Sequence, residues 1–108
     1  MTDIELTATP EYLRVSVRGA DSCIRWSMAE RLAKALEHRR RDVWICGDLT
    51  VEWPDHFCAV SVGRCAKTMS PDDASEVAGG VRKMIDAHRV WSAANGQAVL
   101  DTWLEDFA

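Results

Sequence analysis

The chain has 108 residues, of which 47% are apolar and 28% charged, with a formal net charge of −4 at neutral pH. This length suits one domain with one core, and the composition excludes a disordered or low-complexity protein. No apolar stretch reaches the ~20 residues that span a bilayer, and the first residues lack a basic and then apolar leader, so we expect a cytoplasmic protein without membrane association. Without an export signal, the four cysteines are expected to be reduced thiols.

Two short strands open the chain. Residues 4–8 and 13–17 both alternate apolar and polar side chains, which is the period of a strand with one buried face. Residues 9–12 contain a proline and have the composition of a turn. A four-residue loop pairs Ala8 with Leu13, Leu6 with Val15 and Ile4 with Val17, which places every apolar side chain on one face.

A first helix is predicted to begin near Asp21 or Ser22 and to end before the basic residues 39–41. Its apolar residues recur at helical spacing and should form one stripe that packs on the sheet. The stripe consists of Ile24, Met28, Leu32, Ala35 and Leu36.

A second hairpin follows the same pattern as the first, with residues 54–57 as its loop. This loop pairs Trp53 with Cys58, Val51 with Val60 and Leu49 with Val62. A shift of the sequence by 45 residues superposes the two hairpins, for example Val15 on Val60 and Val17 on Val62.

The second helix has a clear start, because Ser70 can cap it and Pro71 suits its first position. Gly79 and Gly80 in its middle indicate a bend or the close approach of another backbone. Asn95 and Gly96 are expected to end it, and residues 98–107 then form a short amphipathic third helix.

The expected fold is α+β: a four-stranded antiparallel sheet with helices on one face, in the order strand, strand, helix, strand, strand, helix, helix. The whole chain forms one domain. Residues 4–38 and 43–94 form a pseudo-repeat of a hairpin-and-helix unit, which fits either an internal duplication or two unrelated units that pack in the same way.

The outer face of the second hairpin is the first candidate binding surface. One continuous strand would place Trp44, Cys46, Asp48, Thr50 and Glu52 on this face, opposite Lys67, Cys65, Gly63, Ser61 and Ala59. An exposed tryptophan among small residues is typical of a protein interface. We expect Trp44, Cys46, Asp48 and Glu52 to bind a protein partner or a second copy of the chain, unless another part of the fold covers them.

The C-terminal segment is the second candidate surface. Trp103 and Phe107 lie on its apolar face with Leu100 and Leu104, and its acidic residues are Asp101, Glu105 and Asp106. Such a helix either completes the core of its own domain or inserts into a groove of a partner, and its acidic flanks favour a basic partner.

Basic residues offer an alternative function, the binding of nucleic acid. Arg39, Arg40 and Arg41 form the one dense basic cluster, and Arg14 and Arg18 on the first hairpin would extend it. The acidic net charge makes nucleic acid the less favoured partner, since a basic helix end also complements the helix dipole.

No constellation of residues indicates catalysis, a cofactor or a metal. Cys46 and Cys65 would face each other, but the chain has no Cys-x-x-Cys spacing, and its three histidines lie far apart in the sequence. We therefore expect a non-enzymatic protein-binding module: an inhibitor, an adaptor or a subunit. Ten arginines against three lysines favour an origin in a GC-rich bacterium, phage or mobile element. A phage-encoded inhibitor of a host defence complex (anti-CRISPR-like) is one example of this class.

Overall fold

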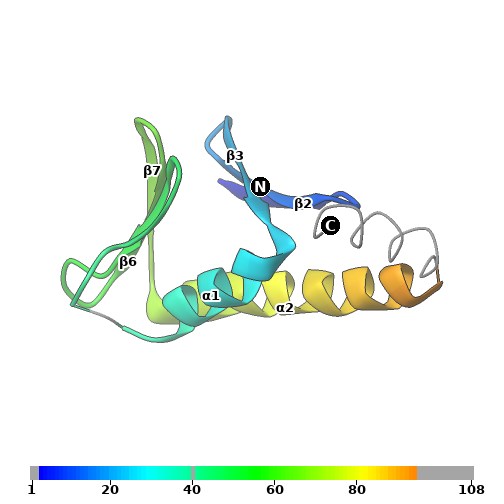
Figure 1. The fold of residues 1–108 in the computed structure, drawn as a ribbon. Helices are drawn as coiled ribbons and strands as arrows, with labels where there is room; N and C mark the ends of the chain where they lie inside the picture. Colours follow the sequence, from blue (N-terminus) through cyan, green and yellow to red (C-terminus); the bar gives the residue numbers. More distant parts are fainter. Residues whose placement is uncertain (1–2, 40, 95–108) are drawn as a thin grey trace.

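Two antiparallel sheets stand on a pair of helices (Figure 1). The computed structural model describes residues 3–39 and 41–94. The first sheet has the order β1 (Ile4–Ala8), β2 (Tyr12–Val17) and β3 (Ala20–Arg25), and α1 (Trp26–Glu37) follows it. The second sheet has the order β4 (Trp44–Cys46), β5 (Leu49–Glu52), β6 (Cys58–Val62) and β7 (Cys65–Met69), and α2 (Pro71–Ala94) follows it. The predicted α+β class with antiparallel pairing is confirmed.

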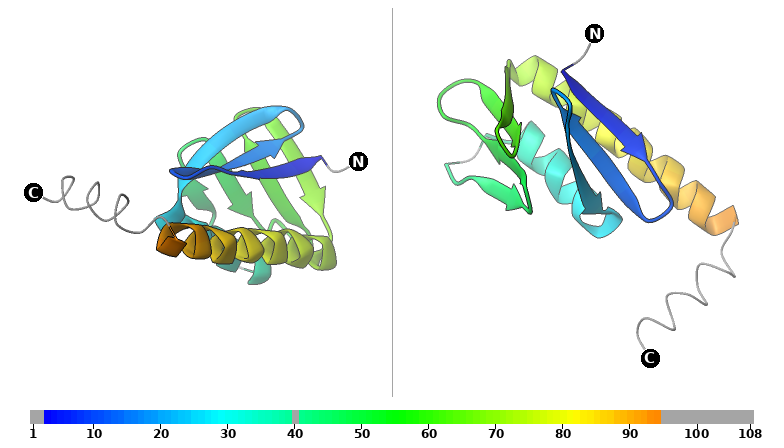
Figure 2. Two further views of the ribbon diagram at one scale, coloured as in Figure 1. Left: turned by 90° about the vertical axis from the view of Figure 1, so that its right-hand side faces the viewer. Right: turned by 90° about the horizontal axis from the view of Figure 1, so that it is seen from above.

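The core lies where the inner faces of the two sheets meet each other and the helices. β2 contacts β6 and β7 across the sheets, and α1 packs along α2. Figure 2 shows both sheets on the same side of the helix pair. Alternate residues of the two central strands are buried there: Leu13, Val15 and Val17 from β2, and Cys58, Val60 and Val62 from β6.

The predicted pairing of both hairpins is confirmed, except that β5 ends at Glu52 and the expected Trp53–Cys58 pair is not part of the ladder. β1 pairs with β2 through Ala8–Leu13, Leu6–Val15 and Ile4–Val17. β5 pairs with β6 through Leu49–Val62 and Val51–Val60. In each case the alternation of apolar residues agrees with the loop length, so a slip by one residue would turn the apolar side chains to solvent.

The predicted start of the first helix at Asp21 or Ser22 is wrong, because these residues belong to β3. A two-residue turn at Arg18 and Gly19, both with positive φ (51° and 92°), sends the chain back along β2 and pairs Val17 with Ala20. The inward side chains of β3 before Ile24 are small, so the strand lacks an apolar alternation. Asp21 and Ser22 are residue types that often cap a helix, which is why the sequence predicts a helix start there.

Two more tight turns add strands to the second sheet. Gly47 and Gly63 have φ of 61° and 58°, and each is the first residue of a two-residue turn. Glycine at that position is the mark of a type II′ hairpin. The residues before Gly47 therefore form a separate strand, β4, and those after Arg64 form β7. The four-stranded sheet is built from residues 44–69 alone, without a strand from the first hairpin.

The predicted start of α2 is confirmed. The Ser70 hydroxyl accepts a hydrogen bond from the Asp73 backbone N–H at 3.2 Å, and Pro71 is the first helical residue. Ala74, Ala78 and Val81 form its buried face. The predicted helix end at residues 95–96 and the predicted third helix at 98–107 lie outside the described residues.

The glycine pair in α2, at which the close approach of another backbone is one expectation, lies next to a side chain instead. A Cβ atom at Gly80 would lie 3.4 Å from Cδ1 of Leu6 on β1, whereas a Cβ at Gly79 would meet nothing within 4 Å. Gly80 thus faces β1, and a Cβ there would be in van der Waals contact with Leu6. Gly79 lacks such a contact.

The two halves of the fold correspond element by element. A shift of 45 residues places β1, β2, β3 and the start of α1 on β5, β6, β7 and the start of α2. Even isolated backbone hydrogen bonds recur at this offset: Arg18 N–H donates to the Asp3 carbonyl at 2.7 Å, and Gly63 N–H donates to the Asp48 carbonyl at 3.2 Å. β4 and the second half of α2 are additions to this common plan. An internal duplication remains one of the two explanations for this correspondence.

Alanine at either helical glycine should stabilise the fold. Gly79→Ala is expected to raise the free energy of unfolding by about 1 kcal/mol, because glycine is a poor helix former and the added methyl meets open space. Gly80→Ala, the matched comparison, should gain at least as much, because its methyl adds a van der Waals contact with Leu6. Urea unfolding of both variants measures the difference, and a smaller gain for Gly80→Ala would contradict this description of the packing.

Candidate binding surface

Trp44 is a core residue, and its predicted exposure on the outer face is wrong. The Gly47–Asp48 turn pairs Cys46 with Leu49 and Trp44 with Val51, so Trp44 and Cys46 point inward. Trp44 is only 9% exposed. A continuous strand through Gly47 would keep the alternation unbroken, whereas a two-residue turn reverses the strand and exchanges the inner and outer positions. The sequence did hold a signal for this turn, a Gly-Asp pair between apolar residues.

The predicted pairing of Cys46 with Cys65 is also wrong. Their partners are Leu49 and Val62, at opposite ends of one inner row of the sheet. All four cysteines are free thiols, and burial raises the pKa of the Cys58 thiol to about 11, which keeps it protonated and unreactive at neutral pH. Among the described residues, no group of three or more His, Cys, Asp or Glu side chains is placed to hold a metal ion.

The residues that do lie on the outer face of the second sheet are mostly small, and only one of them is charged. We call this surface the β4–β7 face. It has two rows across the strands, one of Ile45, Thr50, Ser61 and Ala66 and one of Glu52, Ala59 and Thr68. The Thr50 and Ser61 hydroxyls are hydrogen-bonded to each other.

Three large apolar side chains stand on or beside the β4–β7 face. Ile45 on β4 is 62% exposed, Val43 just before β4 is 45% exposed, and Phe57 in the loop before β6 is 51% exposed. None of them belongs to the buried core. They differ from Trp44, the expected anchor, in lying on the solvent side of the sheet.

The outer face of the first sheet provides an internal comparison. At the positions equivalent to Thr50, Ala59 and Ala66 by the 45-residue offset, it has Glu5, Arg14 and Asp21, all exposed. The same backbone geometry therefore tolerates charged side chains at these places. The low charge of the β4–β7 face is not a requirement of the fold.

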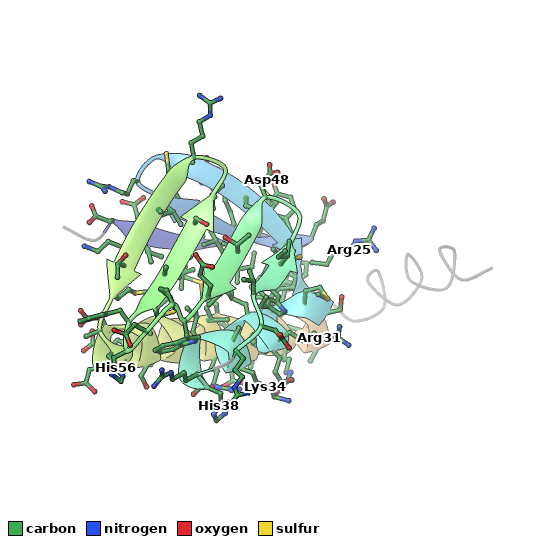
Figure 3. All side chains as sticks on the ribbon, turned by 90° about the vertical axis from the view of Figure 1, so that its left-hand side faces the viewer. Arg25, Arg31, Lys34, His38, Asp48 and His56 are labelled. Carbon is green, nitrogen blue, oxygen red and sulfur yellow. The ribbon has the colours of Figure 1, made fainter. Side chains whose placement is uncertain are left out.

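A basic border runs along the α1 side of the β4–β7 face. Arg31 and Lys34 on α1 and His38, the residue that directly follows α1, are spaced three and four residues apart and are all exposed. Figure 3 shows them below the four-stranded sheet, seen from its outer side. Arg39 continues the border, with its Nη1 3.3 Å from Nδ1 of His56 in the β5–β6 loop. We call these four residues, Arg31, Lys34, His38 and Arg39, the basic rim.

The structure separates the other predicted binding residues. Asp48 is exposed at the β4–β5 turn, and Glu52 is exposed on the β4–β7 face. Trp103, Phe107, Asp101, Glu105 and Asp106 lie outside the described residues.

The arginines of the nucleic-acid alternative are not gathered into one patch. Arg14 lies on the outer face of the first sheet and Arg18 in the turn after β2, while Arg39 and Arg41 follow α1. The inner faces of the sheets meet, so their outer faces point in different directions (Figure 1). Arg40 lies outside the described residues.

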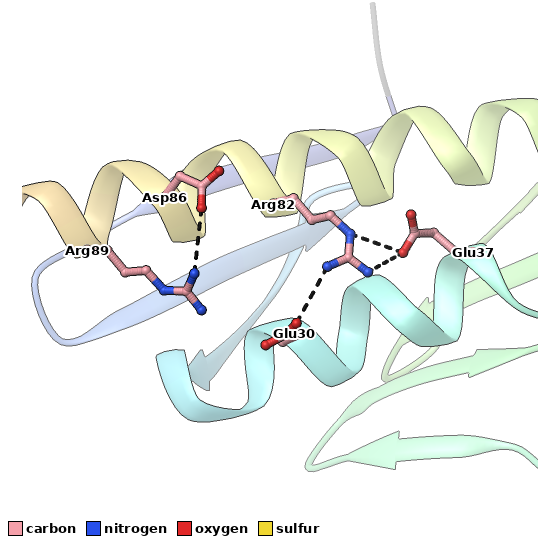
Figure 4. A network of polar contacts seen from close by, with 5 residues as sticks. All are labelled: Glu30, Glu37, Arg82, Asp86 and Arg89. Atoms are coloured by element: carbon pink, nitrogen blue, oxygen red, sulfur yellow. Dashed lines mark hydrogen bonds and ion pairs between the residues drawn. The ribbon is translucent and has the colours of Figure 1, made fainter.

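A shallow depression of about 240 Å³ between the helices is lined by Glu30, Arg82, Ile85, Asp86 and Arg89. Its charges already satisfy one another (Figure 4). Arg82 donates from Nε to Glu37 at 3.1 Å, contacts the same carboxylate through Nη2, and lies 3.7 Å from Glu30, while Arg89 pairs with Asp86 at 3.8 Å. The network joins α2 to α1 and leaves no convergent set of groups for a ligand. Among the described helices, none is both long and apolar enough to cross a membrane.

Alanine substitutions at two adjacent residues of β4 should have very different effects on stability, because one side chain is in the core and the other is on the surface. Trp44→Ala is expected to lower the free energy of unfolding by about 3 kcal/mol, because it removes a large buried side chain. Ile45→Ala should change it by no more than about 0.5 kcal/mol, because the side chain is mostly in solvent. Urea denaturation measures both values, and equal losses would show that Ile45 is packed.

Acid should weaken the Arg82–Glu37 pair. The hydrogen bond from Arg82 lowers the pKa of Glu37, so the pair stabilises the fold fully above the unfolded-state pKa of about 4.3, and this contribution is lost as the pH falls through the lower folded pKa. Stability measured from about pH 7 to 3 should therefore fall more steeply for the wild type than for Glu37→Gln. Glu76→Gln, an exposed change elsewhere on α2, should keep the wild-type slope. Parallel curves for the wild type and Glu37→Gln would show that the pair does not contribute.

No family model matches this chain, and no curated protein and no solved structure matches it either. Its function is therefore inferred from its own surfaces. Among those described, the β4–β7 face combines exposed apolar side chains with a low charge, one carboxylate at Glu52, that the fold does not require.

Proposed function

We propose that this protein is a non-enzymatic protein-binding module that binds a larger partner through the β4–β7 face. The observation on which this rests is the contrast between two equivalent sheet faces. One has Glu5, Arg14 and Asp21, and the other has Thr50, Ala59 and Ala66 at the corresponding positions. An inhibitor, an adaptor and a subunit of a complex would all use such a surface.

Because its side chains are mostly small and uncharged, this face loses little free energy when a partner removes it from water. A charged group that loses water on binding must be paired, or its desolvation opposes association. The two rows of the face contain only one charged residue, Glu52. Ile45, Val43 and Phe57 supply the apolar area whose burial favours association.

The two edges of the second sheet differ in their contacts. On the β7 edge, the Lys67 ammonium pairs with the Asp3 carboxylate at 3.0 Å, which ties this edge to the start of the chain. β4 forms the other edge and has a neighbouring strand on one side only. An edge strand offers backbone N–H and C=O groups to an added strand. A partner that covers Ile45 can therefore also extend the sheet.

The basic rim indicates the chemistry of the partner. Arg31, Lys34 and His38 lie along one border of the face, whereas Glu30 and Glu37 of the same helix are turned toward Arg82 of α2. We infer a partner surface with apolar side chains at its centre and carboxylates on the side that meets α1.

The internal comparison supplies the test variant. Ala59→Arg combined with Ala66→Asp gives the second sheet the residues that the first sheet already has at equivalent positions, so we expect the fold to remain intact. Immobilised wild-type protein and this variant are exposed to an extract of the organism that makes the protein, and retained proteins are identified by mass spectrometry. The variant is expected to lose at least about tenfold of a partner retained by the wild type.

The matched control is Arg14→Ala combined with Asp21→Ala, which removes charge from the outer face of the first sheet. It should retain the same partner as the wild type. Equal retention by all three proteins would contradict the proposed surface. Retention that disappears after nuclease treatment would assign the basic residues to nucleic acid and would contradict a protein partner.

A further inference from the structure

We propose that the β4–β7 face binds residues 98–107 from a second copy of this chain. This inference rests on the proposed function, because it names an occupant for the same face. It gives the protein a second state, in which two copies cover the surface that each would otherwise present to its partner.

The segment has the chemistry that the face and its rim require. Residues 98–107 contain three acidic residues and no basic ones, and their apolar residues are spaced for one side of a helix. Trp103 and Phe107 are large anchors of the kind that bury well on a flat apolar surface. Carboxylates on the flank of such a segment complement the ammonium and guanidinium groups of Lys34 and Arg31 in the basic rim.

The length of α2 explains why the segment comes from another copy. α2 begins two residues after β7 and continues for 24 residues, so its last residue is roughly 36 Å from the second sheet. Figure 1 shows this end of α2 at the far end of the molecule from β6 and β7. Residues 95–97 span at most about 10 Å, and a ten-residue helix adds about 15 Å. A helical segment 98–107 therefore does not reach the face of its own copy.

Contacts in the first half of the fold hold α2 in this direction. The His88 ring stacks on Trp26 with 4.3 Å between ring centroids, and its Nε2 lies 2.9 Å from the Pro10 carbonyl oxygen. Trp26 in turn donates from Nε1 to the Thr9 carbonyl at 2.9 Å. The second half of α2 is thus fastened to the β1–β2 loop and to the start of α1. The segment leaves the domain from a fixed point directed away from the second sheet.

Reciprocal exchange closes the assembly at two copies. If each copy gives its segment to the face of the other, both faces are covered and no open chain of molecules forms. Such a dimer competes directly with a larger partner, because both use the same surface. At low concentration the monomer presents the face, and at high concentration the dimer conceals it.

Sedimentation velocity over a range of protein concentrations tests this arrangement with two full-length variants. The face variant is Ala59→Arg with Ala66→Asp, and the segment variant is Trp103→Ala with Phe107→Ala. The wild type is expected to dimerise with increasing concentration, and each variant alone should dimerise at least about tenfold more weakly. An equimolar mixture should associate more strongly than either variant alone, because the intact segment of the first can bind the intact face of the second. Circular dichroism and urea unfolding confirm that both variants are folded.

Other outcomes overturn the inference. A wild type that stays monomeric at all concentrations shows that the face does not bind the segment. A segment variant that dimerises like the wild type shows that the second copy is held by other residues. In the capture experiment, the segment variant should retain at least as much partner as the wild type, whereas the face variant should lose it. If the segment variant loses the partner too, the segment contacts the partner instead of competing with it.

Discussion

Three tight turns decide which side chains enter the core. A two-residue hairpin turn reverses the chain and exchanges the inward and outward positions, and Arg18–Gly19, Gly47–Asp48 and Gly63–Arg64 each do so. Without the turn at Gly47, Trp44 would face solvent and Ile45 would face the core. The buried layer between the sheets, and therefore the composition of both outer faces, depends on these few residues with positive φ.

A comparison of the two halves shows which residue types the fold requires and which it merely tolerates. The inner rows are apolar in both halves, and the helix positions that share a 45-residue offset even contact each other, as Glu37 and Arg82 do. The outer faces share their backbone but not their charge. A requirement of folding would act on both halves alike, so the difference points to selection for something other than stability. Protein binding is the explanation that we favour.

The sequence predicted the elements whose signals were local and regular. The β1–β2 and β5–β6 pairings followed from alternation and loop length, and the start of α2 followed from Ser70 and Pro71. It missed β3, because small inward residues leave no alternation. It also assigned Trp44 and Cys46 to the wrong face, because a strand pattern continues across a glycine turn with little change in apparent period. Ile45 could be recognised as exposed only after that turn was placed.

The anchoring of α2 by His88 also bears on how the chain folds as it is synthesised. The Pro10 carbonyl and the His88 ring are separated by 78 residues, so this contact forms only when nearly all of the helix has left the ribosome. Until β6 emerges, the inner row of β2 has no opposing sheet. The first half therefore spends part of synthesis with an apolar face uncovered, the condition in which nascent chains aggregate or engage chaperones. Correct folding of this small domain is a late event that involves both halves together.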